Sequence, residues 1–504
     1  MIKKSSILCL FVSLLSFAWR PGNVLAIDKS SELDRLFNYY HEVGMFNGAV
    51  LAAENGRVIY SQTFGFSDFE NKTSLSPSSV FCIGSVTKPF TALAVMILKE
   101  RGKLSYDDKL TKYFPEFEVY ARDVSLRHLL THTSGMPDYA NDLKMQLQHP
   151  VLTNALVFDA LVRQPALKFK AGEKYAYSNS GYFLLAMVIE KVSGKKYGEF
   201  LAENIFRPLG MDHTFAYDET MAVIPNRVNG YENIWQKRDE YLQWKVAGNG
   251  NIYSIAHDLW LFDQALYKET LVRQSTLREA YDTTRLIANN RNGRKYGFGW
   301  HILGDSGQVV YHRGGLEGFR CQYWRNLEKH DALIILGNNT WLSSCPDILT
   351  GAENIMLGKP YTLAKQDVTV LFFEHWYLKG YEPALRNLLE AKAKARTQYE
   401  FSEQSINDLG YSFMNRGEFR KAVEIFKLNV ELFPESANVY DSLGEAYMKS
   451  GDTKQAIIHY EKSLKLDPQN TGTMEILKKL REGDTVLDPR GDLPGAWMPA
   501  GGYL

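Results

Sequence analysis

Cysteine is scarce in this sequence, with four residues among 504. A fold built mainly on disulfides is therefore excluded, because such frameworks are dense in cysteine. Charge of one sign is not in excess either, since 58 Lys and Arg balance 58 Asp and Glu. Without a global basic field we expect no nucleic-acid partner. The apolar fraction of 45% allows full hydrophobic cores, and the length suits about two to three domains.

Long apolar runs are missing beyond the first residues. Two lysines near the N-terminus precede an apolar run at 7–19, and a small residue, Ala26, follows. This run is shorter than the about 20 residues of a membrane-spanning helix and is typical of a secretory signal peptide. We expect cleavage after Ala26, a periplasmic or secreted mature protein and no membrane span in it; the alternative is an uncleaved anchor. The mature chain keeps Cys82, Cys321 and Cys345, which permit at most one internal disulfide of open pairing.

The pattern along residues 27–362 mixes strands and helices. Residues 47–65 predict a hairpin around Asn55-Gly56, a dipeptide suited to positive φ. Apolar residues at helical spacing predict a helix over 86–101. Further helices are expected at 126–131, 180–193, 196–205 and 256–267, and further strands at 299–302, 309–311, 321–324 and 332–335. Strands near both ends of this region predict one antiparallel sheet that the two ends of the region build together, with helices flanking it and a helical lobe in addition.

A repeat of 34 residues appears in the C-terminal part, which is rich in helix formers from about residue 363. Seven positions recur at this period: Leu409, Gly410, Phe413, Gly417, Ala422, Phe426 and Pro434 match Leu443, Gly444, Tyr447, Gly451, Ala456, Tyr460 and Pro468. Small residues at four of these positions would let paired helices approach closely. The stretch 402–468 resembles tetratricopeptide (TPR) repeats. We expect a degenerate helical pair at 367–396 and residues 472–481 to complete the stack, or the stack to dock on the first domain.

The strongest chemical signal lies at the start of the helix predicted over 86–101. Ser85 and Lys88 are three residues apart, so they share one helix face and the amine can reach the hydroxyl. A serine needs an adjacent base to become a nucleophile, and burial beside a positive helix start would lower the lysine pKa. On its own, a Ser-x-x-Lys pair favours the simpler interpretation of a helix N-cap serine with a solvated lysine.

Three motifs in order give this pair its context. Residues 81–90, Phe-Cys-Ile-Gly-Ser-Val-Thr-Lys-Pro-Phe, are followed by Tyr177-Ser178-Asn179 and by His312-Arg313-Gly314. With the flanking phrases at 129–135, 206–211 and 296–300, they resemble class C β-lactamases and related penicillin-recognising serine hydrolases. The resemblance covers about residues 30–360. It implies an α/β (α+β) domain of the β-lactamase/transpeptidase type, followed here by an all-α TPR-like repeat domain.

The resemblance also implies a role for each motif residue. Ser85 would be the acylated nucleophile, and Lys88 and Tyr177 would share the work of the base, through a neutral amine or a phenolate. Asn179 would position the substrate. The backbone N–H groups of Ser85 and Gly315 would form the oxyanion hole. Two further residues would line the substrate site: Gly314, which suits close approach of a substrate backbone, and His312, which would orient a leaving group or a carboxylate.

The third motif departs from true β-lactamases, which carry a lysine at the position of His312. Imidazole is mostly neutral at pH 7, so it should hold a drug carboxylate weakly. We therefore expect an esterase or a D-amino-acid peptidase of the DD-carboxypeptidase type. The alternatives are a true β-lactamase, or a penicillin-binding sensor or scaffold with little turnover whose repeats recruit a protein or peptide partner. The repeats could equally serve only to brace the hydrolase.

Other motifs are better explained without chemistry. His128 and His132 have a spacing seen in zinc helices, but Leu129 follows the first histidine where that motif needs a glutamate, so a structural role is expected. The stretch 304–307, Gly-Asp-Ser-Gly, predicts a hairpin turn. Asn249, between two glycines, predicts a flexible loop. No G-x-S-x-G elbow occurs, so the sequence does not support an α/β-hydrolase. We expect no metal and no cofactor.

The predicted organisation has four parts. Residues 1–26 form the signal peptide and 27–362 the hydrolase domain. Residues 363–482 form the helical repeat domain, and 483–504 an irregular tail rich in Gly and Pro.

Overall fold

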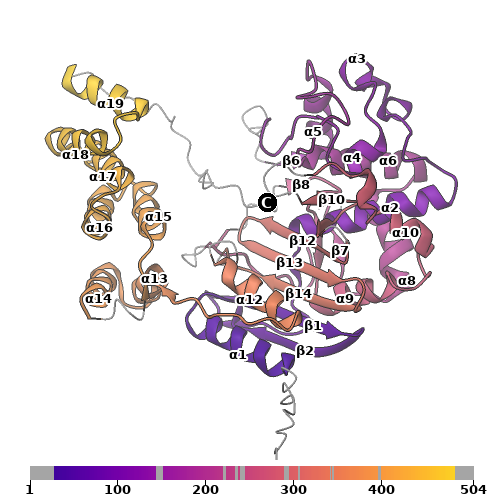
Figure 1. Cartoon of the computed structure of the whole chain (residues 1–504), viewed down its shortest axis with the longest axis horizontal. Helices are drawn as coiled ribbons and strands as arrows, with labels where there is room; N and C mark the ends of the chain where they lie inside the picture. The colour runs from indigo at the N-terminus through magenta and orange to yellow at the C-terminus, as the bar shows by residue number, and fades with distance from the viewer. Residues whose placement is uncertain are drawn as a thin grey trace, which may run out of the picture.

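The computed structural model describes residues 28–143, 151–218, 223–232, 237–238, 244–288, 294–304, 307–340, 342, 345–394 and 399–482. The signal-peptide and tail predictions lie outside these residues, as do Asp305 and Ser306 of the predicted turn. Figure 1 shows two parts: a region of mixed helices and strands (residues 28–356, the mixed region), which contains one large sheet, and beside it a column of paired helices (residues 368–482). None of the described helices is both long and apolar enough to cross a membrane.

The large sheet joins the two ends of the mixed region, as the sequence predicts. Its seven strands have the order β10-β11-β12-β13-β14-β1-β2. Their bounds are β1 (Gly48–Glu54), β2 (Arg57–Phe64), β10 (Lys295–Tyr296), β11 (His301–Leu303), β12 (Val309–Leu316), β13 (Phe319–Asn326) and β14 (Asp331–Gly337). The β1–β14 pair is antiparallel, with Val50 opposite Ile335, and so ties the first strand to the last. Asn55 and Gly56 turn the β1–β2 hairpin with φ of 50° and 75°.

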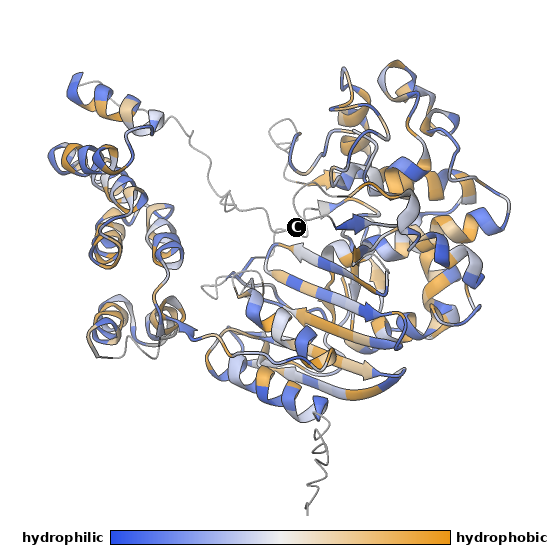
Figure 2. Cartoon of the chain, in the orientation of Figure 1, coloured by the Kyte–Doolittle hydropathy of each residue, from blue (hydrophilic) through white to orange (hydrophobic). Residues whose placement is uncertain are grey.

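Both faces of this sheet are buried, because side chains alternate between two hydrophobic cores. One core lies under α1 (Lys29–Glu42) and α12 (Pro346–Met356) and includes Trp324 and Leu333. The other core includes Tyr323 and Ile334 and continues into the helical lobe. Figure 2 shows β14 as largely hydrophobic.

The helical lobe and the small sheets complete this region. The remaining helical elements are η1 (Gly84–Val86), α2 (Thr87–Glu100), η2 (Leu110–Lys112), η3 (Pro115–Phe117), α3 (Glu118–Ala121), α4 (Leu126–Leu130), α5 (Asn154–Val162), α6 (Asn179–Ser193), α7 (Tyr197–Leu201), η4 (Ala202–Phe206), α8 (Arg207–Leu209), α9 (Ala256–Ala265), α10 (Gln274–Glu279) and η6 (Thr283–Arg285). The short strands are β3 (Phe66–Asp68), β4 (Thr73–Ser74), β5 (Phe81–Cys82), β6 (Leu152–Thr153), β7 (Phe215–Ala216), β8 (Trp244–Lys245) and β9 (Ile252–Ser254).

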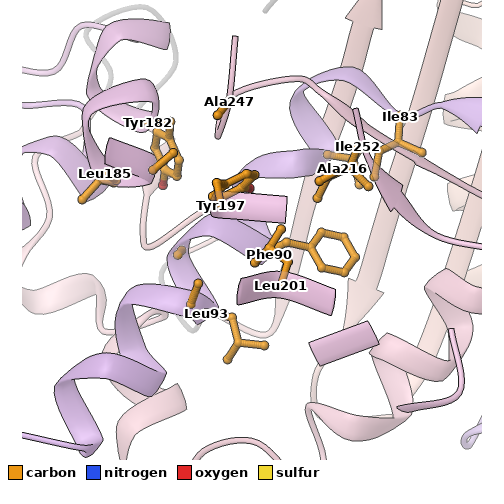
Figure 3. Close-up of a cluster of buried hydrophobic side chains, with 14 of the residues drawn as sticks. Ile83, Phe90, Leu93, Tyr182, Leu185, Tyr197, Leu201, Ala216, Ala247 and Ile252 are labelled. Atoms are coloured by element: carbon orange, nitrogen blue, oxygen red, sulfur yellow. The ribbon is translucent and has the colours of Figure 1, made fainter. Parts of the chain in front are cut away.

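Helix α2 is the centre of the larger core. Every residue from Thr87 to Leu98 is buried, so the helix is enclosed on all sides rather than amphipathic. Figure 3 shows Phe90 and Leu93 of this helix among Tyr197 and Leu201 of α7 and Tyr182 of α6. Burial of this kind contributes about 25 cal/mol per Å² of apolar surface and fixes the start of α2 in space.

The C-terminal helices form antiparallel pairs, which confirms the predicted helical repeats. They are α13 (Val368–Lys379), α14 (Tyr381–Lys394), α15 (Glu403–Met414), α16 (Phe419–Leu432), α17 (Ala437–Lys449), α18 (Thr453–Leu466) and α19 (Thr471–Glu482). Gly410 explains the close helix approach, because a Cβ there would lie 2.4 Å from Phe426 Cε1. Gly444 plays the same part opposite Tyr460, with a distance of 3.0 Å. Helix α19 packs on α18 through Ile476 and Leu477 and ends the stack.

The repeats join the first region through a short anchored segment. Tyr39 Oη donates to the Ala364 carbonyl oxygen at 2.7 Å, and the Ala364 N–H donates to Tyr40 Oη at 3.0 Å. Val370 of α13 is buried in the core under α1. The short strands β15 (Gln366–Asp367) and β16 (Tyr399–Glu400) then pair in parallel where the repeat core begins. The first repeat helix is thus attached to the mixed region at its N-terminal end.

Candidate active site

Ser85 lies at the junction of the large antiparallel sheet and the helical lobe. It sits in η1, directly before α2, and is 9% exposed. Two glycines let strand β12 approach this turn. A Cβ at Gly84, which has φ of 51°, would lie 2.9 Å from the Gly315 nitrogen, and a Cβ at Gly314 would lie 1.9 Å from the Ile83 carbonyl oxygen. The close approach therefore depends on glycine at both positions.

Lys88 Nζ has three partners at hydrogen-bond distance. It lies 3.0 Å from Ser85 Oγ, and it donates to Asn179 Oδ1 at 3.0 Å and to the Asn249 carbonyl oxygen at 2.8 Å. The predicted reach from Lys88 to Ser85 across one helix turn is thus present. The lysine side chain is fully buried.

Burial lowers the pKa of Lys88 to about 7, and the charge of Asp138 opposes that shift. Near neutral pH a large fraction of the amine is therefore uncharged. A neutral amine has two N–H donors and one lone pair. Since two carbonyl oxygens take the hydrogens, the lone pair is left for the Ser85 hydroxyl.

Tyr177 meets the same oxygen from the other side. Its hydroxyl donates to Ser85 Oγ at 3.0 Å. Burial raises the pKa of the Tyr177 phenol well above its usual value, and the Ser85 hydrogen bond lowers it by less. The phenol is therefore protonated at neutral pH and acts as a donor. Of the two bases that the resemblance implies, the electrostatics favour the Lys88 amine over a phenolate.

The position of Tyr177 depends on the loop at His132, a residue for which the sequence predicts a structural role. The Ala176 N–H donates to the His132 carbonyl oxygen at 2.8 Å, and the Ser178 N–H donates to His132 Nδ1 at 3.1 Å. The His132 ring lies over the Tyr177 ring with centroids 4.3 Å apart. Burial and then the nearby Lys88 lower the pKa of His132 well below its usual value, so this ring is neutral.

Asn249 corrects one prediction. The two flanking glycines suggested a flexible loop, but Asn249 is 9% exposed, and its carbonyl oxygen accepts from Lys88. Its side-chain Nδ2 donates to Tyr139 Oη at 2.8 Å. Asp138, which no motif marked, accepts from the Asn179 N–H at 3.1 Å. Sequence reasoning missed both residues because neither a backbone carbonyl nor a lone loop aspartate has a sequence signature.

His312 lies near Tyr177, with ring centroids 6.4 Å apart, but it is 1% exposed. Its Nε2 is 2.9 Å from Tyr296 Oη, and its Nδ1 is 2.7 Å from the Arg313 carbonyl oxygen. Burial, His301 and Lys88 lower the pKa of His312 well below its usual value, so the ring is neutral. That it orients a leaving group or a carboxylate stays a prediction, and a substrate would have to replace one of these hydrogen bonds.

The end of β12 provides an open strand edge beside Ser85. Among the described residues, β11 pairs with Val309, Val310 and Tyr311 of β12, whereas β13 pairs with the whole strand. The segment 312–316 therefore faces η1, and Gly315 is exposed. The amides of Ser85 and Gly315 lie on the two sides of this junction, where an oxyanion hole is expected.

The described residues contain no group of three His, Cys, Asp or Glu side chains suited to a metal. His128 closes a capping box at the start of α4 with Ser125, while His132 packs on Tyr177. The two histidines therefore have separate structural surroundings. Cys82, Cys321 and Cys345 are buried free thiols in the structure.

Comparisons with known proteins agree with this fold. The family model described as Beta-lactamase matches residues 33–341, and the model described as Tetratricopeptide repeat matches residues 437–470. Penicillin-binding protein 4* of Bacillus subtilis (strain 168) is 34% identical over 361 residues, which cover 67% of this chain and 78% of that protein.

Solved structures show the same fold. An octameric penicillin-binding protein homologue from Pyrococcus abyssi matches with a TM-score of 0.58 and 26% identity, over 65% of this chain and 77% of that one. The D-amino acid amidase from Ochrobactrum anthropi SV3 matches with a TM-score of 0.57 and 22% identity, over 66% of this chain and 99% of that one. The expected β-lactamase/transpeptidase-like fold is thus confirmed, and this chain belongs to the β-lactamase family as a serine hydrolase that also carries tetratricopeptide repeats.

Proposed function

We propose that this chain is an exported serine acyl hydrolase that works through an acyl-enzyme on Ser85. One observation carries the proposal: Lys88 Nζ and Tyr177 Oη each lie 3.0 Å from Ser85 Oγ, and they arrive from different elements. A hydroxyl held between a neutral amine and a phenol has the base that nucleophilic attack needs.

Acylation begins when Ser85 Oγ attacks the substrate carbonyl carbon. Its proton passes to the lone pair of Lys88, and the carbonyl oxygen takes up the negative charge beside the amides of Ser85 and Gly315. The bond to the leaving group then breaks. The leaving alcohol or amine takes up the proton that Lys88 received, relayed through the Tyr177 hydroxyl, which gives one proton and accepts another, so that Lys88 is again a neutral amine and Tyr177 a phenol.

Deacylation repeats these steps with water as the nucleophile. Lys88 accepts a proton from water, the oxygen attacks the acyl carbon, and Ser85 leaves as an alcohol. The products are a carboxylic acid and the free enzyme. A lysine with a pKa of about 7 serves both half-reactions, because it can take up and release a proton at neutral pH.

The substrate class that we favour is an ester or a D-amino-acid peptide. A β-lactamase would need a cation for the drug carboxylate, whereas the histidine at the third motif is buried and neutral with both ring nitrogens engaged. One of the similar folds belongs to a D-amino acid amidase, which supports a peptide-like substrate. The signal-peptide pattern supports a periplasmic or secreted location, and so does the similarity to a penicillin-binding protein.

The repeats favour a second role, the recruitment of a protein or peptide partner. Residues 437–470 match the tetratricopeptide model, and the repeat helices have a hydrophobic core of their own. Stacked repeats of this kind form extended concave surfaces, which suit a protein or peptide partner.

The test is a substrate panel of short-chain p-nitrophenyl esters, D-alanyl-D-alanine peptides and a chromogenic cephalosporin. We expect turnover of an ester or a D-peptide, slow cephalosporin hydrolysis, and loss of every activity in Ser85→Ala. Efficient cephalosporin hydrolysis would instead favour the β-lactamase alternative. A stoichiometric burst without turnover would favour the sensor, and equal turnover in Ser85→Ala would refute the proposal.

A further inference from the structure

The lone pair of Lys88 points at Ser85 only if two acceptors hold the other two positions of the amine. The acceptors come from separate parts of the chain. Asn179 begins helix α6, and Asn249 lies in the turn before β9. If either oxygen turned away, the amine could rotate and aim an N–H at the serine instead. Something must therefore fix both oxygens.

Asp138 fixes the side-chain oxygen of Asn179. Its Oδ1 accepts from the Asn179 backbone N–H at 3.1 Å, and its Oδ2 accepts from Asn179 Nδ2 at 3.3 Å. A carboxylate only accepts hydrogen bonds, so the amide nitrogen of Asn179 must face Asp138. The opposite end of that amide, Oδ1, is thereby turned toward Lys88.

The Asp138 carboxylate is itself held in place. Asn141 Nδ2 donates to Oδ2 at 2.6 Å, and the Ala140 N–H donates to Oδ1 at 3.3 Å. Asp138 is 4% exposed. Its own N–H donates to Asp142 Oδ2 at 2.8 Å, so the loop around it is closed on both sides.

Tyr139, the next residue, contacts the second acceptor. Its hydroxyl accepts from Asn249 Nδ2 at 2.8 Å, and its backbone N–H donates to Ser180 Oγ at 2.9 Å. The tyrosine is 1% exposed. One dipeptide therefore contacts the residues that supply both carbonyl oxygens for the Lys88 amine.

We propose that Asp138 and Tyr139 are positioning residues for the general base: Asp138 orients the Asn179 amide, and Tyr139 anchors the side chain of Asn249, whose backbone oxygen is the second acceptor for Lys88. This inference rests on the proposed function, in which Lys88 is the base. It gives the loop at 134–141 a part in the reaction that its sequence does not reveal.

Charge acts in the same direction as geometry. The groups that face Lys88 are the Tyr177 and Tyr182 rings, Asp138, and the histidines His132, His301 and His312. Burial lowers the pKa of all three histidines, to about 3 for His301, so they are neutral at pH 7. Burial raises the pKa of both phenols.

Asp138 is therefore the charge that keeps the Lys88 pKa from falling further. Beyond it, Asp142 is paired with Lys168 Nζ at 2.7 Å. An aspartate that served only to stabilise the start of α6 would also accept the Asn179 N–H. Its charge would reach Lys88 as well, so the midpoint of the pH limb reports the charge, and the plateau rate of the folded enzyme reports the aim of the amine.

The experiment compares wild type with Asp138→Asn, Asp138→Ser and Tyr139→Phe. The control is Asp159→Asn, which removes an exposed carboxylate on α5 that lies 3.9 Å from Arg163. Pre-steady-state acylation by p-nitrophenyl acetate is followed from pH 5 to pH 9. Rates are normalised to the fraction of chains that a fluorophosphonate labels on Ser85, so that misfolded protein does not count.

Loss of the Asp138 charge should lower the midpoint of the acid limb by about one pH unit in both Asp138 variants. The plateau should fall at least tenfold, because the Asn179 amide is free to turn. Tyr139→Phe should lower the plateau several-fold with little change in midpoint, and Asp159→Asn should match wild type. The two Asp138 variants differ in size and polarity, so either one that folds gives the answer.

An unchanged plateau in a folded Asp138 variant overturns the proposal, because the aim of the amine then does not depend on Asp138. An unmoved limb overturns it too, because a reduced plateau alone indicates a structural role. Failure of wild type to label on Ser85 would instead refute the proposed function. The two failures are therefore distinct.

Discussion

The buried amine of Lys88 makes the pH dependence of acylation predictable. Burial moves the pKa of Lys88 from 10.5 to about 7. If the neutral amine is the base, the acylation rate should be constant well above pH 7. Below pH 7 it should fall tenfold per pH unit, to about 1% of the plateau at pH 5. A lysine with its ordinary pKa would give a rate that still rises between pH 8 and pH 10.

The assay is the single-turnover release of p-nitrophenol from a short-chain ester, measured by stopped flow with enzyme in excess. Excess enzyme isolates acylation from deacylation, so the limb reports the base that activates Ser85. A limb with its midpoint near pH 7 supports the assignment. A rate that is flat from pH 5 to pH 9, or that rises throughout this range, would refute the reasoning about Lys88.

The same shift links Lys88 to folding stability. Between pH 7 and pH 10.5 the unfolded chain binds more protons at this lysine than the folded chain, so stability rises with pH in this window. The cost of burying Lys88 is therefore largest below pH 7, at about 5 kcal/mol. Relative to Lys88→Met, wild type should gain about 2 kcal/mol between pH 7 and pH 9. Urea unfolding at the two pH values measures the difference, and a pH-independent difference would contradict the shift.

Three further changes test other parts of the structure. Tyr177→Phe should slow acylation about tenfold to a thousandfold without moving the acid limb of the pH profile, because the phenol is a donor rather than the base. Stopped-flow measurement of acylation across the pH range tests this, and a moved limb would disprove it. Gly410→Ala should lower the free energy of unfolding by about 1–3 kcal/mol, and Gly444→Ala should lower it by less, because the new Cβ atoms would lie 2.4 Å and 3.0 Å from ring carbons. Equal melting temperatures for wild type and Gly410→Ala would count against tight repeat packing. Asp263→Ala should lower the free energy of unfolding by about 3–5 kcal/mol, because it leaves the buried Arg325 without the carboxylate that lies 2.5 Å from its Nε. Denaturant unfolding measures this loss, and a loss below 1 kcal/mol would argue against the importance of the pair.

The parts of the fold that the sequence predicts best are those that depend on local periodicity. The Ser85–Lys88 contact needs only one turn of helix, and the repeat helices follow from a period of 34 residues. The closure of the sheet by β1 and β14 was also predictable, because strands occur near both ends of the mixed region.

Features that depend on long-range packing were less predictable. Residues 299–302 predicted a strand, but β11 begins at His301 because Gly299 has φ of 83°. A Cβ at that glycine would lie 2.8 Å from Pro89 Cα, so contact with the start of α2 decides the local backbone. Asn249 holds Lys88 through a backbone oxygen, which any residue type possesses. Sequence patterns carry no information on such a contact.

The central claim is that Ser85 carries the acyl group, and the most direct measurement is mass spectrometry of the intact protein after brief exposure to an activated ester near neutral pH and a rapid acid quench. We predict a single added acyl mass that peptide mapping assigns to residues 81–90. The label should be absent from Ser85→Ala and retained in Asp159→Asn. An adduct on any other residue of the active wild-type protein, or turnover without any adduct on Ser85 under conditions that trap the acyl-enzyme, would contradict the account.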